Sequence, residues 1–377
     1  MAKNRMNAAN SPLDSVSHIL TSSPRYVTED AQPDSKVHSA PDQSSKEKSN
    51  DCVKLVFAAS NGGHLGQAMR LRRDLGSAAI VVTTEESTLS YPGDSIATVP
   101  TLRNIRSWIR NSANSALLAL RLRPEIVVSF GARDVAFFCL WSKLIGAKLI
   151  LVESFARVRT PSRFLRALAP LANRILVQWP ELRERVPAST LVRPIYSLRP
   201  PVSHPLHNVL VVVGTSRVGM DRLLRMVDEA SPLSGSPLVT CQIGGSEYTP
   251  SRADWYRWKP AADFWGDISK ADLIITHDGS NTIGLSLELA KPVVVVPRTA
   301  AELDYESNAE LAIELSRRTW VGLATDVREL REAIVRVSDL SPMSDFQGPT
   351  IASCVADEIE KTRTRKLPGM ASERSES

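Results

Sequence analysis

The sequence predicts an α/β protein built from two domains with parallel sheets, and three observations support this fold class. Short β-branched runs alternate with segments of helical periodicity, which is the pattern of buried parallel strands joined by crossover helices. The alternation stops at a proline-rich stretch, residues 194–208, and then starts again. No internal repeat of fixed short period is present, which argues against a solenoid.

Length and composition indicate a globular protein. The chain has 377 residues, of which 43% are hydrophobic and 23% are charged, and these fractions exclude a wholly disordered or fibrous protein. No apolar run reaches the ~18 residues of a transmembrane helix. The four cysteines are widely separated, and the chain lacks HxH, HExxH and DxD patterns. We therefore expect no disulfide framework, no metal site and no cofactor.

Both ends of the chain are predicted to be tails. Residues 1–51 are rich in Ser, Asp, Asn, Pro and Lys, and they cannot bury enough apolar surface to offset the entropy of ordering. The first residues have no apolar core, so we expect no secretory signal and a cytoplasmic protein. Residues 346–377 are predicted to form a last helix near Ile351–Lys361 and then a second disordered tail.

The first domain is predicted to span residues 52–193. Each of its strands is a short apolar run followed by a turn and an amphipathic segment. The predicted strands are Lys54–Ala58, Ala79–Thr83, Glu125–Ser129, Lys148–Val152 and Arg174–Gln178. The predicted helices between them are Gly66–Leu75, Ile105–Leu122, Val135–Leu144 and Ser162–Leu171.

The second domain is predicted to span residues 209–345, after a linker (194–208) whose four prolines favour an extended chain. Its predicted strands are Val209–Val213, Leu238–Ile243, Leu273–Thr276 and Pro292–Val296, with helices at Met220–Glu229 and Asn281–Leu289. Ligands of such folds bind beyond the carboxyl ends of the strands. The expected site is therefore the cleft between the two domains.

A glycine loop follows the first strand. Asn61, Gly62 and Gly63 precede a helix whose free N–H groups and positive dipole end suit an anion. His64 lies at the mouth of this loop, and its ordinary pKa near 6.5 suits it to take a proton from a hydroxyl. A simple tight turn would explain the two glycines alone. The functional interpretation therefore depends on His64 together with loops of the second domain.

Three strands of the second domain end in small or hydroxyl residues, which together predict a nucleotide diphosphate site. We expect Ser280, Asn281 and Thr282 to cap the helix that they begin, while its N–H groups bind the pyrophosphate. Each loop alone is ordinary turn chemistry. The candidate donor-binding residues are Gly214, Thr215, Ser216, Gly244, Gly245, His277, Gly279, Ser280, Asn281 and Thr282.

A polar cluster follows Pro297. Carboxylates and amides hold sugar hydroxyls well, so Glu302, Asp304 and Asn308 are candidate donor-sugar contacts, although a solvated helix start is the alternative. Arg298 would favour an acidic sugar, because a guanidinium binds a carboxylate with two hydrogen bonds.

The net charge of +5 is concentrated in the first domain. Residues 103–174 contain thirteen basic and three acidic residues. Basic residues flanking apolar ones suit contact with anionic lipid headgroups, whereas a helix packed on its sheet with solvated arginines is the alternative. For the apolar residues of Ile105–Leu122 we expect core burial. No nucleic-acid motif accompanies the charge. The candidate membrane contacts are Arg106, Trp108, Arg110, Arg163, Phe164 and Arg166.

Several segments resemble known glycosyltransferases. The segments SNGGHLGQ, LRNIRSWIRN, PEIVVSFGA, LVESFARVRTPS and LANRILVQWPEL resemble the PssD-type subunit of bacterial exopolysaccharide glycosyltransferases and the membrane-anchoring subunit of the dolichol-pathway N-acetylglucosaminyltransferase. VLVVVGTS, KADLIITHDGSNTIGLSLELAKPVVVVPR and ESNAELA resemble the PssE-type, nucleotide-sugar-binding partner. The resemblance covers about residues 53–340. It implies two normally separate subunits in one chain, with the GT-B fold of MurG-related enzymes.

The resemblance also implies roles for single residues. His64, in the family's GGH loop, is the candidate catalytic base, and Glu153 either orients the acceptor or acts as the base instead. Gly214, Thr215, His277 and the 279–282 segment match the donor-phosphate loops. The sequence departs from the family pattern at four positions, which leaves donor identity and full activity open: Arg133, Asp278, Leu285 and Asn308.

These patterns predict an inverting glycosyltransferase that needs no metal or cofactor. Its substrates would be a UDP-sugar, with glucuronic acid or N-acetylglucosamine as the sugar, and a polyprenyl-diphosphate-linked saccharide. It would act at the inner face of the membrane in exopolysaccharide or glycolipid synthesis, with polysaccharide-assembly proteins as possible partners and no nucleic acid. The alternatives are a UDP-sugar 2-epimerase of the same fold and a non-catalytic component that binds a UDP-sugar.

Overall fold

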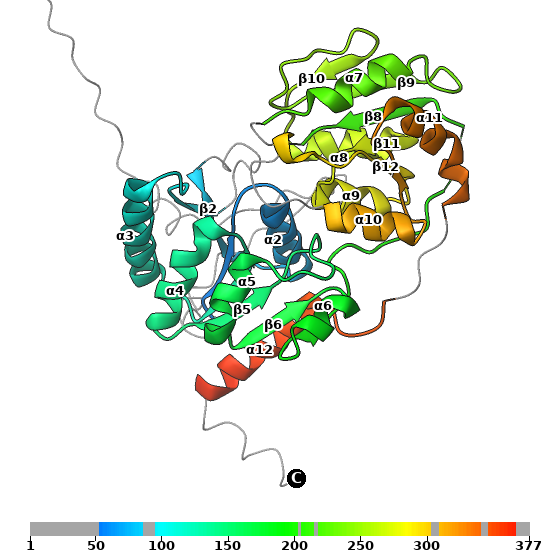
Figure 1. Cartoon of the computed structure of the whole chain (residues 1–377). Coiled ribbons are helices and arrows are strands. Elements are labelled where there is room, and N and C mark those ends of the chain that lie inside the picture. The colour runs from blue at the N-terminus through cyan, green and yellow to red at the C-terminus, as the bar shows by residue number, and fades with distance from the viewer. Residues whose placement is uncertain are drawn as a thin grey trace, which may run out of the picture.

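The computed structural model describes residues 53–85, 95–202, 205–214, 218–302, 309–340 and 346–366. The predicted tail at residues 1–51 lies outside these ranges. Within them the chain forms two lobes, each an α/β unit with its own sheet (Figure 1).

The first lobe contains a seven-stranded parallel sheet with the order β3-β2-β1-β4-β5-β6-β7. Its strands are β1 (Leu55–Ala59), β2 (Ile80–Thr84), β3 (Ile96–Val99), β4 (Ile126–Gly131), β5 (Lys148–Val152), β6 (Arg174–Val177) and β7 (Thr190–Leu191). Its helices are α2 (Gly63–Asp74), α3 (Ile105–Leu122), α4 (Ala136–Leu144), α5 (Arg163–Leu168) and α6 (Pro180–Arg185). The strand order reverses between β1 and β4, the point at which open α/β sheets bind ligands.

The second lobe contains a six-stranded parallel sheet with the order β10-β9-β8-β11-β12-β13. Its strands are β8 (Asn208–Val212), β9 (Leu238–Gln242), β10 (Asp254–Tyr256), β11 (Leu273–Thr276), β12 (Val293–Val295) and β13 (Gly322–Leu323). Its helices are α7 (Asp221–Ala230), α8 (Ala261–Lys270), α9 (Ser280–Glu288), α10 (Ala309–Arg317) and α11 (Val327–Val335). Its strand order reverses between β8 and β11.

The predicted fold class is confirmed. The central strands β1, β4, β11 and β12 are buried along their whole length, as strands covered by helices on both faces must be. The sequence reading missed β3, β7, β10 and β13, which are short strands near the sheet edges and lack a long apolar run. Short 3₁₀ turns lie at Arg133–Val135, Ala169–Leu171, Ala300–Glu302 and Arg336–Asp339.

The apolar residues of α3 correct a prediction. Leu118 is buried against the sheet, but Ile105, Ile109 and Leu120 are 75%, 67% and 55% exposed. The buried face of the helix combines Leu118 and Leu122 with Ser115, Ala119 and Asn111. The Asn111 side chain donates to the carbonyls of Pro100 and Asp134. The helix therefore presents an apolar stripe away from the core.

The two lobes are packed directly against each other. Helix α2 of the first lobe contacts α9 of the second (Figure 1). Arg70 on α2 forms an ion pair with Glu288 on α9. One apolar core runs continuously from the first sheet into one side of the second. Tyr196, in the linker between the lobes, is buried in this core and stacks edge-on against Phe155.

The C-terminal helix α12 (Ile351–Lys366) returns to the first lobe (Figure 1). Lys148 on β5 donates to Glu358, and Arg174 on β6 donates to the carbonyl of Cys354. Before the helix, the ring of Phe346 lies edge-on to Trp179 of the first lobe and Trp320 of the second. The end of the described chain therefore ties the two lobes together.

The linker's approach to α9 predicts the effect of a single methyl group. A Cβ on Gly284 would collide with the Tyr196 ring, so Gly284→Ala should lower the free energy of unfolding by about 1–3 kcal/mol. Gly266, on α8, has open space around it, so Gly266→Ala should raise stability by up to ~1 kcal/mol because alanine favours a helix. Urea denaturation would measure both. Equal effects of the two variants would contradict the close packing of the linker on α9.

Candidate functional site

The loop after β1 leaves the start of α2 open. Gly62, the N-cap residue, has a φ of 83° and makes no side-chain cap hydrogen bond. The Asn61 side chain accepts a hydrogen bond from the N–H of Gly62 at 2.8 Å, which fixes the turn just before the helix. The first N–H groups of α2, from Gly63 onward, therefore remain available to an anion.

His64 lies in the first turn of α2 and is half-buried. Burial lowers its pKa to about 4, the Arg157 charge adds to this, and the carbonyl of Phe130 opposes it. Its Nδ1 is buried and has no hydrogen-bond partner among the described residues. At neutral pH the imidazole is therefore uncharged, as a proton acceptor must be.

Glu153, the other candidate base, is enclosed at the end of β5. Its carboxylate accepts hydrogen bonds from the N–H groups of Ser154 and Ser162, both at 2.9 Å. Burial raises its pKa, and these hydrogen bonds oppose the shift. Because its two oxygens hold the ends of the 153–162 turn, the geometry gives Glu153 a supporting position.

In the second lobe, His277 fills the space between two glycines at the switch point of the sheet. A Cβ on Gly214 would lie 2.6 Å from the His277 Cε1 atom, and one on Gly279 would lie 2.5 Å from it. The His277 Nδ1 is 3.3 Å from the carbonyl oxygen of Val212. Burial lowers the pKa of His277 to about 3, and the Arg298 charge adds to this, so His277 is neutral.

The start of α9 is open as well, which corrects a prediction. Gly279 is the N-cap residue and makes no side-chain cap hydrogen bond, whereas we expected Ser280, Asn281 and Thr282 to cap the helix. These three residues lie in the first turn instead. Asn281 accepts a hydrogen bond from the Tyr196 hydroxyl at 3.1 Å. The first N–H groups of α9 are therefore also available to an anion.

The two open helix starts lie against each other. A Cβ on Gly63 would be 3.1 Å from the Ser280 hydroxyl oxygen, and one on Gly66 would be 2.5 Å from the Asn281 Oδ1 atom. Glycine at these positions therefore permits the close approach of α2 and α9. The structure thus brings together the glycine loop of the first lobe and the 279–282 segment of the second.

The backbone groups of Gly214, after β8, and of Gly244, after β9, form hydrogen bonds within the second lobe. Gly214 donates its N–H to the Gln242 side chain at 3.0 Å, so this N–H is not free for a phosphate. The N–H and carbonyl of Gly244 both bond to Arg257, and the Ser246 hydroxyl accepts the N–H of Met220. Gly245 lies in the turn between them. These loops support the site rather than face it.

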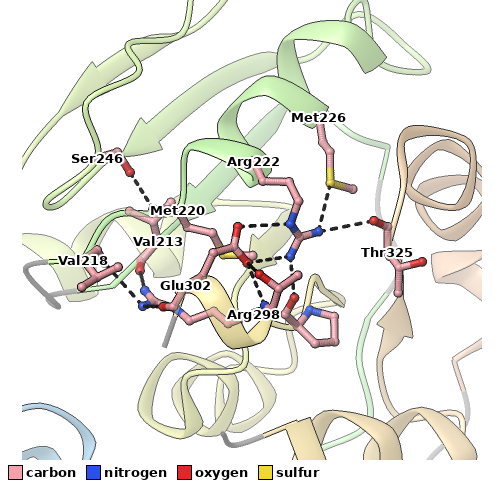
Figure 2. Close-up of polar contacts among 11 residues, drawn as sticks. Val213, Val218, Met220, Arg222, Met226, Ser246, Arg298, Glu302 and Thr325 are labelled. Carbon is pink, nitrogen blue, oxygen red and sulfur yellow. Dashed lines mark hydrogen bonds and ion pairs between the residues drawn. The ribbon is translucent and has the colours of Figure 1, made fainter. Parts of the chain in front are cut away.

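Arg298 and Glu302 also have partners within the protein (Figure 2). Arg298 is buried and donates to the carbonyls of Val213, Val218 and Glu302, at 2.7, 3.4 and 3.2 Å. The Glu302 carboxylate forms an ion pair with Arg222 at 3.0 Å. Burial opposes a low pKa for Glu302, but Arg222 and Thr299 lower it. Neither side chain is placed to read a sugar.

Some expected site residues lie outside the described part of the chain, and others are buried. Thr215, Ser216, Asp304 and Asn308 belong to segments that the structure does not describe. Asp278 and Leu285, two departures from the family pattern, are 2% and 3% exposed. The sequence reading also missed Arg222, Gln242 and Tyr196, because a single polar or aromatic residue on an apolar element carries no signal of its partners.

The candidate membrane contacts divide into two groups. On α3, Arg106, Trp108 and Arg110 are all exposed. On α5, Arg163 and Arg166 are exposed, whereas Phe164 is half-buried and its ring lies beside Gly131. In the described ranges, no helix combines the length and apolarity needed to cross a membrane.

Comparison with known proteins divides the chain in the same way as its two lobes. Residues 95–194 match the family model "Oligosaccharide biosynthesis protein Alg14 like", and residues 208–338 match the "Glycosyltransferase family 28 C-terminal domain".

Two curated relatives show the same relationship. The UDP-N-acetylglucosamine transferase subunit alg14 of Schizosaccharomyces pombe is 30% identical over 172 residues, which cover 37% of this chain and 81% of the relative. The UDP-N-acetylglucosamine--N-acetylmuramyl-(pentapeptide) pyrophosphoryl-undecaprenol N-acetylglucosamine transferase of Bradyrhizobium sp. (strain BTAi1 / ATCC BAA-1182) is 26% identical over 360 residues, covering 82% of this chain and 97% of the relative.

Solved structures agree on the fold. MurG of Acinetobacter baumannii aligns with a TM-score of 0.50 at 16% identity, covering 81% of this chain and 99% of that one. A UDP-N-acetylglucosamine 2-epimerase of Listeria monocytogenes, described as putative, aligns with a TM-score of 0.62 at 12% identity, covering 82% and 96%. The chain therefore belongs to the Alg14- and MurG-like glycosyltransferases of the GT-B fold, with an Alg14-like domain and a family 28 C-terminal domain in one polypeptide.

Proposed function

We propose that the protein transfers N-acetylglucosamine from UDP-N-acetylglucosamine to a hydroxyl of a saccharide linked to a lipid diphosphate. The names of both curated relatives support this sugar. The argument for an acidic sugar is weakened, because the Arg298 guanidinium already donates hydrogen bonds to backbone carbonyls. The setting that we propose is exopolysaccharide or glycolipid synthesis at the inner face of the membrane.

The observation that carries the proposal is the juxtaposition of two uncapped helix starts from different lobes. The N-terminus of a helix bears about half a positive charge, so two such ends in contact repel each other unless an anion lies beside them. Both α2 and α9 begin at glycine N-caps without side-chain caps, and their first turns meet at Gly63 and Ser280. The diphosphates of a nucleotide sugar and of a lipid-linked acceptor supply the charge that this arrangement favours.

The chemistry follows from the position of His64. Its neutral imidazole takes the proton of the acceptor hydroxyl while that oxygen attacks the anomeric carbon of the donor sugar, which gives inversion. The bond from this carbon to the UDP oxygen breaks, and the N–H groups of α9 stabilise the charge on the departing diphosphate. We propose that no metal takes part. A bound acceptor diphosphate would raise the pKa of His64 from about 4 toward the working pH.

The apolar stripe of α3 supports attachment to a membrane surface. Ile105, Ile109 and Leu120 are exposed beside the exposed Arg106 and Arg110. Apolar side chains next to arginines suit the boundary between anionic headgroups and acyl chains. We propose that this helix brings the acceptor side of the enzyme to its lipid-linked substrate.

A transfer assay tests the function directly. Purified protein should move radiolabel from UDP-N-acetylglucosamine to a polyprenyl-diphosphate-linked saccharide in the presence of EDTA, and UDP-glucuronate should be a poorer donor. Epimerised UDP-sugar formed without acceptor would favour a 2-epimerase instead. Binding of UDP-N-acetylglucosamine without transfer to any acceptor would favour a non-catalytic component.

Loss of His64 should affect turnover selectively. His64→Ala should lower kcat by about 10²–10⁴-fold, because general-base catalysis contributes that much, while donor binding by calorimetry should change little. His207→Ala, at an exposed histidine of the linker, is the matched control and should leave kcat unchanged. Turnover of His64→Ala within a few-fold of the wild type would remove His64 from the base role.

The α3 stripe predicts a membrane-binding phenotype. Ile105→Glu combined with Ile109→Glu should lower affinity for vesicles containing phosphatidylglycerol by at least about tenfold, since it removes apolar contact and adds negative charge. Val335→Glu, at a residue of the second lobe that is 66% exposed, should leave vesicle binding unchanged. Sedimentation with vesicles measures both. Equal binding by the α3 variant and the wild type would exclude α3 as the contact.

A further inference from the structure

Arg298 joins two loops on the donor side of the proposed site. It follows β12, and its guanidinium donates to the carbonyl of Val213, directly after β8, and to that of Val218, three residues before α7 begins. It also donates to the carbonyl of Glu302 in its own loop. In the part of the chain that the structure describes, all hydrogen bonds of Arg298 therefore go to backbone carbonyls, and they bridge the connections that follow β8 and β12 (Figure 2).

A second arginine, on α7, reaches from the other side to the loop after β12. Arg222, in the first turn of α7, donates to the carbonyl of Pro297 at 2.6 Å and to both carboxylate oxygens of Glu302, at 3.1 and 3.0 Å. Glu302 also accepts the N–H of Thr299 at 2.8 Å. The loop after β12 is thereby held to α7, while Arg298 holds it to the end of β8.

The peptide at Gly214 is fixed from both sides by these contacts. Arg298 binds the carbonyl of Val213 on one side. The Gln242 side chain accepts the N–H of Gly214 and donates to its carbonyl, both at 3.0 Å. Gly214 has a φ of 87°, and the ring of His277 occupies the space where a Cβ would lie. The position of His277 against α9 therefore depends on the orientation of this peptide.

We infer that Arg298 is a positioning residue of the donor site: it clamps the loop after β12 to the end of β8 and so holds Gly214 and His277 beside the open start of α9. This inference rests on the proposed function, since it assigns the clamped loops to the donor. The planar guanidinium binds several carbonyls at once in a fixed fork, which the single ammonium of a lysine cannot do. Arg298 thus acts through geometry rather than through direct contact with the sugar.

Hydrogen exchange of the unliganded protein tests the clamp itself. In Arg298→Met and Arg298→Lys, amides of the 205–222 segment should exchange about tenfold faster or more than in the wild type. Methionine removes the charged donor, and lysine cannot reach the carbonyls of Val213, Val218 and Glu302 at once. Arg331→Met is the matched control, since Arg331 also donates to two carbonyls of this lobe, those of Glu229 and Ala230. It should leave the 205–222 segment unchanged.

Calorimetry with UDP tests the consequence for the donor. Both Arg298 variants should bind UDP at least about tenfold more weakly than the wild type, while Arg331→Met stays within twofold. Full affinity and normal exchange in Arg298→Lys would overturn the inference, because charge alone would then suffice. If Arg298→Met does not fold, Arg298→Lys alone decides the result. A wild type that does not bind UDP would instead overturn the proposed function, and the inference with it.

Discussion

The contact between the first turns of α2 and α9 is the constraint on which the rest of the structure depends. Glycine at positions 63 and 66 permits this contact, because a Cβ there would lie 3.1 Å from the Ser280 Oγ atom and 2.5 Å from the Asn281 Oδ1 atom. It also sets two positive helix ends side by side, an arrangement that favours a bound anion. The Arg70–Glu288 pair and the buried Tyr196 hold the two helices in this position. The packing of the lobes thus places two helix N-termini side by side where we propose that phosphates bind.

Burial gives the two histidines of the site a common property. His64 and His277 both have pKa values far below neutrality, so neither adds a positive charge to the helix ends beside it. Their surroundings differ, however. His64 is half-buried, and its Nδ1 has no hydrogen-bond partner among the residues that the structure describes, whereas His277 is packed between two glycines. This difference suits His64 to accept a proton, and it suits His277 to support the backbone at Gly214 and Gly279.

Polar contacts divide the donor lobe into a supporting layer and an open edge. Arg298 and Gln242 bond to backbone groups, and Arg222 bonds to the Pro297 carbonyl and the Glu302 carboxylate. Together they hold the connections after β8, β9 and β12. The start of α9 is left with free N–H groups at the edge of this layer. On the other lobe, α3 places its apolar stripe on the outside. One chain thus combines cross-linked loops in the second lobe with an exposed apolar stripe on the first.

The sequence alone determined the two α/β lobes, the α3 boundaries and the glycine loops, because each depends on local periodicity and turn chemistry. Only the tertiary structure decided which polar residues face the site. Arg298 and Glu302 follow a strand, and the sequence therefore suggested them as sugar ligands. In the structure, Arg298 donates to backbone carbonyls and Glu302 forms an ion pair with Arg222. The exposure of the apolar residues of α3 could not be predicted either. Periodicity shows that a helix has an apolar side but not which neighbours cover that side. Partners distant in the chain settle these questions, and they exist only once the chain has folded.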